Sequence, residues 1–221
     1  METEVKLAFK DRISLNLAAS SDWFSSCLIN EGFSPMTLEN IYLDTPDKTL
    51  VSRGAVFRKR HYLGNGTDSY EFTVKCELRV EGGISSRYEW NVKSSSGDIT
   101  SAEFKKRSTE DGDDPSILDE VLSGIEVCDL VPLCSNSFER TVYDFRFGNS
   151  DMEACIDYGE IKDPEGKTCD IICEMELELK EGKIEDLEAA KSFILSNTDA
   201  EPFNTGKFQR TLKASRTGGA L

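Results

Sequence analysis

Residues 173–180 read Cys-Glu-Met-Glu-Leu-Glu-Leu-Lys, with a glutamate at every second position from Glu174 to Glu178. Successive side chains of a β-strand point to opposite faces, so this pattern predicts a strand with one charged face and one apolar face. A solvated outer face on an ordinary sheet would give the same pattern. The strand is therefore predicted from its own residues, but the position of its glutamates depends on the neighbouring strands.

The same alternation of charged and apolar residues recurs in other predicted strands. The charged residues that share faces with such spacing are Glu2, Glu4, Lys6, Arg58, Arg60, Glu71, Lys75, Arg87, Glu89, Arg140, Asp157, Glu174, Glu176, Glu178 and Lys180. If these faces converge inside a closed barrel, the interior holds a carboxylate cluster beside a Lys/Arg cluster. Helices would then cover the apolar outer faces.

Eight strand-like segments, bounded by Gly, Asn, Asp or Pro, suit a closed barrel or a strongly curved sheet. They lie at 2–10 and at about 38–44, 55–62, 68–78, 86–93, 138–147, 152–160 and 170–180. A helix is expected over 14–30, between a Ser cap and Gly32, and an amphipathic helix over 184–195. The acidic stretch 108–120 is expected to be a loop leading into a short helix. We expect one α+β domain over 1–213 and a disordered tail over 214–221.

The charge balance limits the classes of partner. The chain has 221 residues and a formal net charge of −15, which repels nucleic acid and anionic lipid at long range. It contains no apolar run of the roughly 20 residues that span a membrane, and no signal peptide pattern follows Met1. We therefore expect a cytoplasmic protein without nucleic-acid, membrane or obligate protein partners. A phosphate substrate would need locally concentrated cations or metal ions.

Cysteine and histidine contribute little to the expected chemistry. The seven cysteines are scattered and never spaced as CxxC, which indicates buried thiols in a reducing compartment rather than disulfides or a zinc site. The single histidine, His61, is expected to be an ordinary surface or core side chain. Catalysis, if present, then rests on carboxylates, lysines and arginines. Carboxylates on facing strands suit Mg²⁺ or Mn²⁺, and arginine and lysine suit phosphate.

Several motifs follow one another in a characteristic order along the chain. They are Glu2-Thr3-Glu4-Val5-Lys6, Tyr42-Leu43-Asp44-Thr45-Pro46, Leu50–Gly54, Phe57-Arg58-Lys59-Arg60, Phe72-Thr73-Val74-Lys75, Phe138-Glu139-Arg140, Ile156-Asp157-Tyr158-Gly159, Glu174-Met175-Glu176-Leu177-Glu178 and Lys207-Phe208-Gln209-Arg210. In this order they resemble the CYTH, or triphosphate tunnel metalloenzyme, family, whose N-terminal signature is ExExK. The resemblance implies an eight-stranded antiparallel β-barrel, open as a tunnel, with flanking helices and a C-terminal plug helix.

The resemblance also implies roles for individual residues. Glu2 and Glu4 would hold a divalent metal with one or more of Glu174, Glu176 and Glu178. The basic wall that grips the triphosphate would consist of Lys6, Arg58, Arg60, Lys75 and Arg140, joined by Lys207 and Arg210 from the plug helix. Asp157 would bind a metal or position the attacking water, so that Glu4, Lys6 and Asp157 are the catalytic candidates. For Lys207 and Arg210, a solvated surface helix is the alternative. Arg87 and Glu89 are expected to form a cross-strand pair, and Tyr42, Asp44 and Thr45 to shape a turn.

Within the family, inorganic triphosphate is the leading substrate, hydrolysed to diphosphate and phosphate by direct attack of water with Mg²⁺ or Mn²⁺. Class IV adenylyl cyclases typically carry a His-Phe element before ExExK, where this chain has only Met1. Vertebrate-type thiamine triphosphatases place an aromatic residue two positions before the first tunnel arginine, where this chain has Val56. Thiamine triphosphatase or nucleoside triphosphatase activity, adenylyl cyclase activity and a non-catalytic polyphosphate-binding module are the alternatives.

Overall fold

The structure is a computed structural model that describes residues 2–30, 34–64, 69–81, 84–111, 114–163 and 165–217. Its strands are β1 (Glu2–Ala8), β2 (Met36–Asp44), β3 (Ala55–Leu63), β4 (Ser69–Glu81), β5 (Ile84–Ser94), β6 (Val131–Phe147), β7 (Ser150–Lys162), β8 (Thr168–Glu181) and β9 (Glu201–Pro202). Its helices are α1 (Arg12–Ala19), α2 (Asp22–Ser26), α3 (Thr49–Ser52), α4 (Ser101–Asp111), α5 (Pro115–Val121), α6 (Ile184–Asn197) and α7 (Lys207–Thr217), with a 3₁₀ turn at Val127–Asp129.

The strands form one antiparallel sheet that closes on itself. The order is β5-β4-β3-β2-β6-β7-β8-β1, and β1 pairs with β5 to complete the ring. The two residues of β9 pair with Leu7 and Ala8 at the C-terminal end of β1. The predicted eight-stranded antiparallel barrel is therefore confirmed. The closing pair is short, since it joins only residues 2–5 to residues 84–87.

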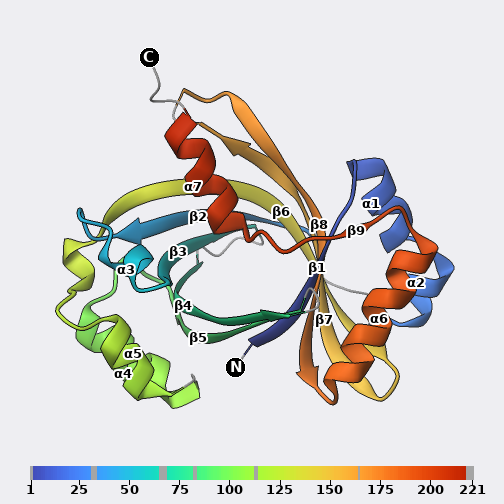
Figure 1. The fold of residues 1–221 in the computed structure, drawn as a ribbon, viewed down its shortest axis with the longest axis horizontal. Helices are drawn as coiled ribbons and strands as arrows, with labels where there is room; N and C mark the ends of the chain where they lie inside the picture. Colours follow the sequence, from blue (N-terminus) through green and yellow to red (C-terminus); the bar gives the residue numbers. More distant parts are fainter. Residues whose placement is uncertain are drawn as a thin grey trace.

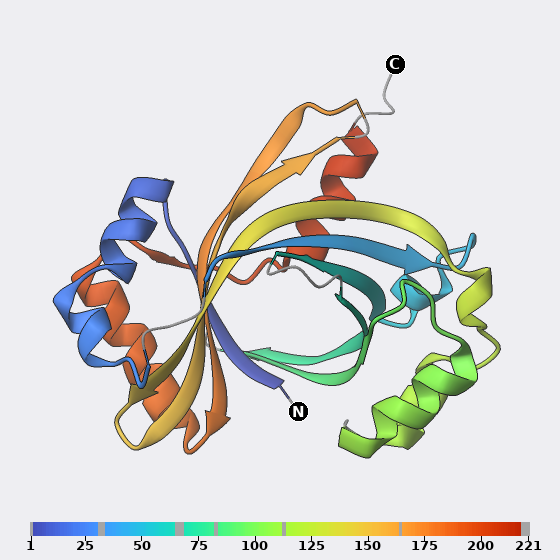
Figure 2. The same ribbon diagram turned by 180° about the vertical axis from the view of Figure 1, so that it is seen from behind.

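Two of the three apolar clusters formed by the described residues lie between the outer face of the barrel and the helices that surround it (Figure 1). The third contains Leu38, Phe138 and Ile172, which share strand faces with the interior charges, and it packs against Ala214 of α7. Helices α4 and α5 cover β3–β5, where Phe57, Trp90 and Phe104 are fully buried. Helices α1, α2 and α6 cover the opposite side of the barrel, as the reverse view shows (Figure 2). No helix of the described residues is long and apolar enough to cross a membrane. Because the side chains of the first two clusters face outward onto helices, the alternate positions of their strands are left to line the interior.

Helix α7 lies across the barrel, at the place expected for a plug helix (Figure 1). It packs on the sheet through Phe208, whose ring lies 5.1 Å from that of Tyr42. The tail predicted over 214–221 begins too early, because α7 continues to Thr217 and Ala214 is buried. Residues 218–221 lie outside the described residues.

Three local predictions are wrong. The helix expected over 14–30 is two helices, because Ser21 accepts a hydrogen bond from the Phe24 amide and caps a new helix there. The expected cap Gly32 lies outside the described residues. The acidic stretch 108–120 contains the end of α4 and most of α5, rather than a loop before one helix. Strand β6 begins at Val131 rather than near 138, since its first part pairs with β2.

The thiols and the histidine do not all lie where expected. All seven cysteines are free, but only Cys155 and Cys173 are buried, whereas Cys128 and Cys169 are exposed. His61 lies on the outer face of β3 and stacks on Tyr70, with ring centroids 4.4 Å apart. Its place is that of an ordinary structural side chain, as predicted.

Asp44 anchors the connection between β2 and β3. Its carboxylate is 1% exposed and accepts hydrogen bonds from the amides of Thr45 (2.7 Å), Leu50 (2.8 Å) and Val51 (3.0 Å). These bonds fix α3 and the segment that follows it against the end of the barrel. The turn-forming role predicted for Asp44 and Thr45 is confirmed, whereas Tyr42 lines the barrel cavity.

We expect Asp44→Ala to lower the free energy of unfolding by about 3 kcal/mol, since it leaves buried backbone donors without an acceptor. Asp47→Ala is the matched control, because Asp47 is exposed and accepts from the hydroxyls of Thr45 and Thr49 in the same loop. Urea unfolding followed by circular dichroism compares the two variants. Equal losses would show that the buried carboxylate is not the anchor.

Candidate functional site

The barrel encloses a cavity of about 950 Å³. Its lining residues include nine basic and seven acidic side chains, so the cavity carries a positive excess inside a chain of net charge −15. The side chains come from alternate positions of the barrel strands and from α7, as the sequence pattern predicts. Charge of both signs is therefore concentrated where the substrate of a phosphate-binding protein would enter.

One group of charges lies along β1 and β5. Glu2 contacts Lys75 at 3.0 Å and also the Arg87 guanidinium, which reaches Glu4 as well. Burial alone would raise the pKa of Glu2, but Lys75 and Arg87 hold it well below its usual range. The prediction for Arg87 and Glu89 is wrong, since both lie on β5 and face other strands, where Glu89 contacts Lys75 at 2.5 Å.

A second group forms a basic wall on β3. Arg58 donates to Glu71 and Thr73, both at 2.9 Å, and Arg60 donates from Nε to Asn40 Oδ1 at 2.8 Å. Burial and the neighbouring cations lower the pKa of Arg60, whereas Glu71 raises that of Arg58 despite burial. Arg58 Nε is buried without a hydrogen-bond partner among the described residues. This wall has donor capacity that an anion would satisfy.

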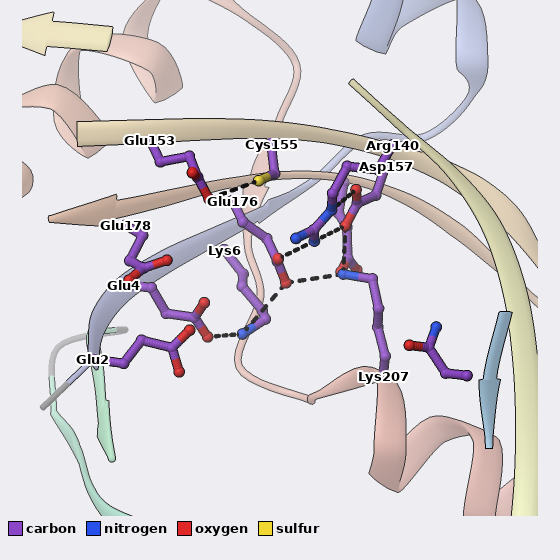
Figure 3. A network of polar contacts seen from close by, with 12 residues as sticks. Glu2, Glu4, Lys6, Arg140, Glu153, Cys155, Asp157, Glu176, Glu178 and Lys207 are labelled. Carbon is purple, nitrogen blue, oxygen red and sulfur yellow. Dashed lines mark hydrogen bonds and ion pairs between the residues drawn. The ribbon is translucent and has the colours of Figure 1, made fainter. Parts of the chain in front are cut away.

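The third group is an acidic cluster deep in the barrel (Figure 3). Asp157, Glu174 and Glu176 each offer an oxygen, and these atoms lie within 4.8 Å of one another. Lys207 Nζ contacts all three carboxylates, at 2.7 Å from Asp157 and 2.9 Å from Glu176. Its pKa is raised because these anions outweigh its burial. Arg140 holds both oxygens of Asp157, at 2.7 and 2.5 Å, and donates to Glu176 at 2.6 Å.

Lys6 separates the six carboxylates that were predicted to bind metal into two sets. It contacts Glu4 on its own strand and lies 3.5 Å from Glu176 (Figure 3). The register of β1 and β8 pairs Glu4 with Glu178 and Lys6 with Glu176. We call Glu2, Glu4 and Glu178 the mouth set, and Asp157, Glu174 and Glu176 the deep set.

Glu178 lies beside other carboxylates. It is paired across strands with Glu4 and with Glu153, and Lys180 lies 2.8 Å from it. Burial and the charge of Glu2 raise its pKa to about 7. Within the mouth set, Glu178 is therefore the carboxylate whose charged form is disfavoured, whereas Lys75 and Arg87 hold Glu2 charged.

The two α7 residues predicted to bind substrate, Lys207 and Arg210, differ in their position relative to the cavity. Lys207 lines the cavity, whereas Arg210 is absent from its lining among the described residues. Arg210 instead donates to Asp170 at 2.7 Å and to Glu174 at 2.9 Å. The substrate contact predicted for Arg210 has no support in this geometry, because Asp170 and Glu174 hold its guanidinium and it does not line the cavity.

The charge pattern did not single out every polar residue of the interior. Glu153 on β7 and Lys93 on β5 line the cavity. Each lies an even number of residues from a predicted residue of the same strand, Asp157 or Glu89, and so shares its face. Asn40 and Asn136 are uncharged, and both are buried beside the basic wall. Their even spacing from Tyr42 and Arg140 places them on the interior face of their strands, but a search for charged residues does not find them.

The comparisons with known proteins agree with this architecture. The sequence model of the CYTH domain matches residues 1–212. A protein from Haemophilus influenzae named inorganic triphosphatase is 28% identical over 186 residues, which cover 84% of this chain and 47% of that protein. The chain thus spans about half the length of that curated relative.

Solved structures show the same fold. One is a Hippeastrum protein named as an adenylyl cyclase that reveals a dominant triphosphatase activity, with a TM-score of 0.63 and 19% identity over 100% of this chain and 98% of that one. Another is PH1819 from Pyrococcus horikoshii, with a TM-score of 0.57 and 16% identity over 95% of this chain and 98% of that one. At such identities the likeness concerns the fold.

The raised pKa of Glu178 predicts a pH-dependent stability. A carboxyl whose folded pKa lies above its usual 4.5 stabilises the fold while protonated, and this contribution is lost as pH rises through about 7. Between pH 5 and 8 the wild type should lose up to about 2 kcal/mol of unfolding free energy relative to Glu178→Gln. Urea unfolding without divalent ions measures this difference. The control is Glu181→Gln, an exposed position on the same strand, whose unfolding free energy should change with pH as that of the wild type does. If the unfolding free energy of Glu178→Gln changed with pH in the same way as that of the wild type, the raised pKa would not belong to Glu178.

Proposed function

The chain belongs to the CYTH domain family, and on that premise we propose that it hydrolyses inorganic triphosphate to diphosphate and phosphate inside the barrel. The observation that carries the proposal is the positive excess of the cavity lining in a strongly acidic chain. A triphosphate presents several negative oxygens and needs recognition by charge alone. The Haemophilus influenzae relative named inorganic triphosphatase supports the same substrate.

The basic wall is assigned to binding. Arg58 Nε lacks a hydrogen-bond partner among the described residues, and Arg60 has a lowered pKa among neighbouring cations. A phosphate oxygen would supply the missing acceptor and the missing negative charge. Lys75 and Arg140 extend the wall along the cavity, and Lys207 reaches it from α7. Fixing a triphosphate at several points aligns it for attack by water.

The carboxylates fit a divalent ion, Mg²⁺ or Mn²⁺, because they offer hard oxygen ligands on facing strands. The mouth set is the better candidate, since the pKa of Glu178 is raised and a nearby cation would favour its charged form. In the deep set the single ammonium of Lys207 contacts all three carboxylates. Among the described residues no cation contacts all three carboxylates of the mouth set. A bound divalent ion would neutralise charge on the phosphate oxygens. Glu2, Glu4 and Glu178 are therefore our proposed ligands, with Glu176 nearest to them across Lys6.

Lys6 and Asp157 receive different roles. Lys6 lies between the two carboxylate sets and lines the cavity, where its ammonium can donate to a phosphate oxygen. Asp157 is fully buried and holds the guanidinium of Arg140 through both oxygens. We assign Lys6 to charge stabilisation during phosphoryl transfer and Asp157 to positioning Arg140.

A triphosphate with an organic group is the second candidate. The cavity has the volume of a site for a drug-sized ligand, and part of its wall is apolar, with Val51, Val56 and Phe208. ATP or thiamine triphosphate could place its organic group there, and the Hippeastrum protein is named as an adenylyl cyclase. Because the charged groups dominate the lining, we place inorganic triphosphate first.

Release of phosphate from inorganic triphosphate, ATP and thiamine triphosphate, measured in parallel with Mg²⁺, Mn²⁺ or EDTA, tests the proposal. We expect inorganic triphosphate to be hydrolysed at least tenfold faster than either organic substrate, and activity to disappear in EDTA. Equal turnover of ATP, or formation of cyclic AMP, would favour the second candidate. Binding of triphosphate without any hydrolysis would indicate a polyphosphate-binding module.

Glu4→Gln should lower kcat by about 100-fold or more, the scale of losing one preorganised electrostatic group, while triphosphate still binds. Steady-state rates across a metal concentration series, with calorimetric titration of triphosphate, measure both quantities. Glu39→Gln is the control, because Glu39 is an exposed glutamate on β2. Full turnover of Glu4→Gln at ordinary metal concentrations would remove Glu4 from the proposed site.

Arg58→Ala should mainly raise KM, by about tenfold or more, if its contact with phosphate is equally strong in the ground state and the transition state. The same kinetics on Arg146→Ala supply the control, since Arg146 is exposed and pairs with Asp151. An unchanged KM would show that Arg58 does not bind the substrate.

A further inference from the structure

A chain of buried hydrogen bonds connects Arg60 on the basic wall with helix α7. Arg60 Nε donates to Asn40 Oδ1 at 2.8 Å, and Asn40 Nδ2 donates to Asn136 Oδ1 at 3.0 Å. Asn136 Nδ2 donates to Thr211 Oγ1 at 2.7 Å, and the Thr211 hydroxyl donates to the Lys207 carbonyl at 2.7 Å. From this geometry we propose that Asn40, Asn136 and Thr211 are positioning residues that make the orientation of Arg60 depend on the docking of α7.

All four bonds run in one direction, and the two ends set that direction. A guanidinium can only donate, and a backbone carbonyl can only accept. Asn40 must therefore turn its oxygen toward Arg60, which leaves its amide nitrogen for Asn136, and the same reasoning fixes Asn136. Turning Asn40 over would place donor against donor at Arg60 and acceptor against acceptor at Asn136, and turning Asn136 over would place donor against donor at Asn40. The chain has one fully satisfied arrangement, and it requires both ends to be in place.

Burial prevents water from replacing a broken link. Asn40 and Thr211 are each 1% exposed, and Asn136 is 7% exposed. The second amide hydrogen of Asn136 faces the Tyr42 hydroxyl at 3.4 Å, so this side chain is held on two sides. A buried polar group that loses its partner costs more than an exposed one, because it is not rehydrated. Movement of α7 would thus disturb Asn136, then Asn40 and finally Arg60.

The two ends of the chain belong to different parts of the candidate site. Lys207 follows Gly206 at the start of α7, and its ammonium lies among Asp157, Glu174 and Glu176. Arg60 lines the cavity wall, and its pKa is lowered while those of the other cavity arginines are raised. The hydrogen-bonded chain therefore joins the Lys207 end of α7 to a guanidinium that lines the cavity wall. Such a coupling is reciprocal, so a substitution near Arg60 that breaks the hydrogen-bonded chain should also loosen the packing of α7.

The kinetic consequence of this inference rests on the proposed function. Thr211→Val keeps the shape of the side chain but removes the acceptor for Asn136, and should raise KM for inorganic triphosphate about fivefold, the scale of one ordinary hydrogen bond. The turnover number should change by less than twofold, and Thr211→Ser should restore KM. Thr198→Val is the matched control, since the Thr198 hydroxyl donates to the Ile194 carbonyl on α6 with the same helical spacing. Equal KM values for Thr211→Val and Thr198→Val would overturn the inference.

Hydrogen exchange of the ligand-free protein tests the coupling without using activity. Asn40→Leu lies on β2, away from α7 in sequence, and should speed exchange of the α7 amides about fivefold. Thr73→Val is the control, because Thr73 is 0% exposed and its hydroxyl bonds to Arg58 and Asn91 rather than to the chain that leads to α7. If Asn40→Leu fails to fold, Asn40→Ala carries the same comparison. Unchanged α7 exchange would overturn the coupling. If the wild type hydrolyses no triphosphate, the proposed function fails, and the exchange result alone decides the inference.

Discussion

The structure depends on pairing charge inside a closed barrel. Isolated charges in such an interior would be prohibitively costly, because burial removes their hydration. Here carboxylates and cations contact one another along β1, β3, β5 and β8, with Lys6 and Lys207 each touching more than one anion. With most of the interior given to charge, most apolar residues of the same strands face outward. That arrangement accounts for the helices that cover both sides of the barrel.

Period-2 alternation predicted the charged faces of the strands, and the resemblance to the CYTH family implied the eight-stranded barrel that brings these faces together. Glu174, Glu176 and Glu178 illustrate both the strength and the limit of that reasoning. Their common face follows from strand geometry, but only the register of β8 against β1 shows that Glu178 faces Glu4 and Glu174 faces Ala8. Register depends on contacts between segments far apart in sequence, which alternation does not encode.

Other features were missed for different physical reasons. The break between α1 and α2 depends on Ser21 acting as a cap within a sequence that has continuous helical spacing. Asn40 and Asn136 carry no charge, so a search for charged faces passed over them although they support Arg60. Arg210 was assigned to the cavity from its motif, whereas its position on α7 directs it to Asp170. Motifs predicted which elements form the site, and packing determined which side chains reach it.

The closure of the barrel by β1 also has a consequence for how the protein acquires its site. Glu2 and Glu4 lie on the first strand, whose neighbours are β5 and β8, so its pairing partners extend to Glu178. During synthesis, β1 leaves the ribosome long before β8 exists and cannot complete its pairing. Contacts of such large sequence separation form slowly, since the chain entropy of closing the loop comes first. The mouth carboxylates are therefore brought together at a late stage of folding, and a nascent chain carries none of the assembled charge cluster.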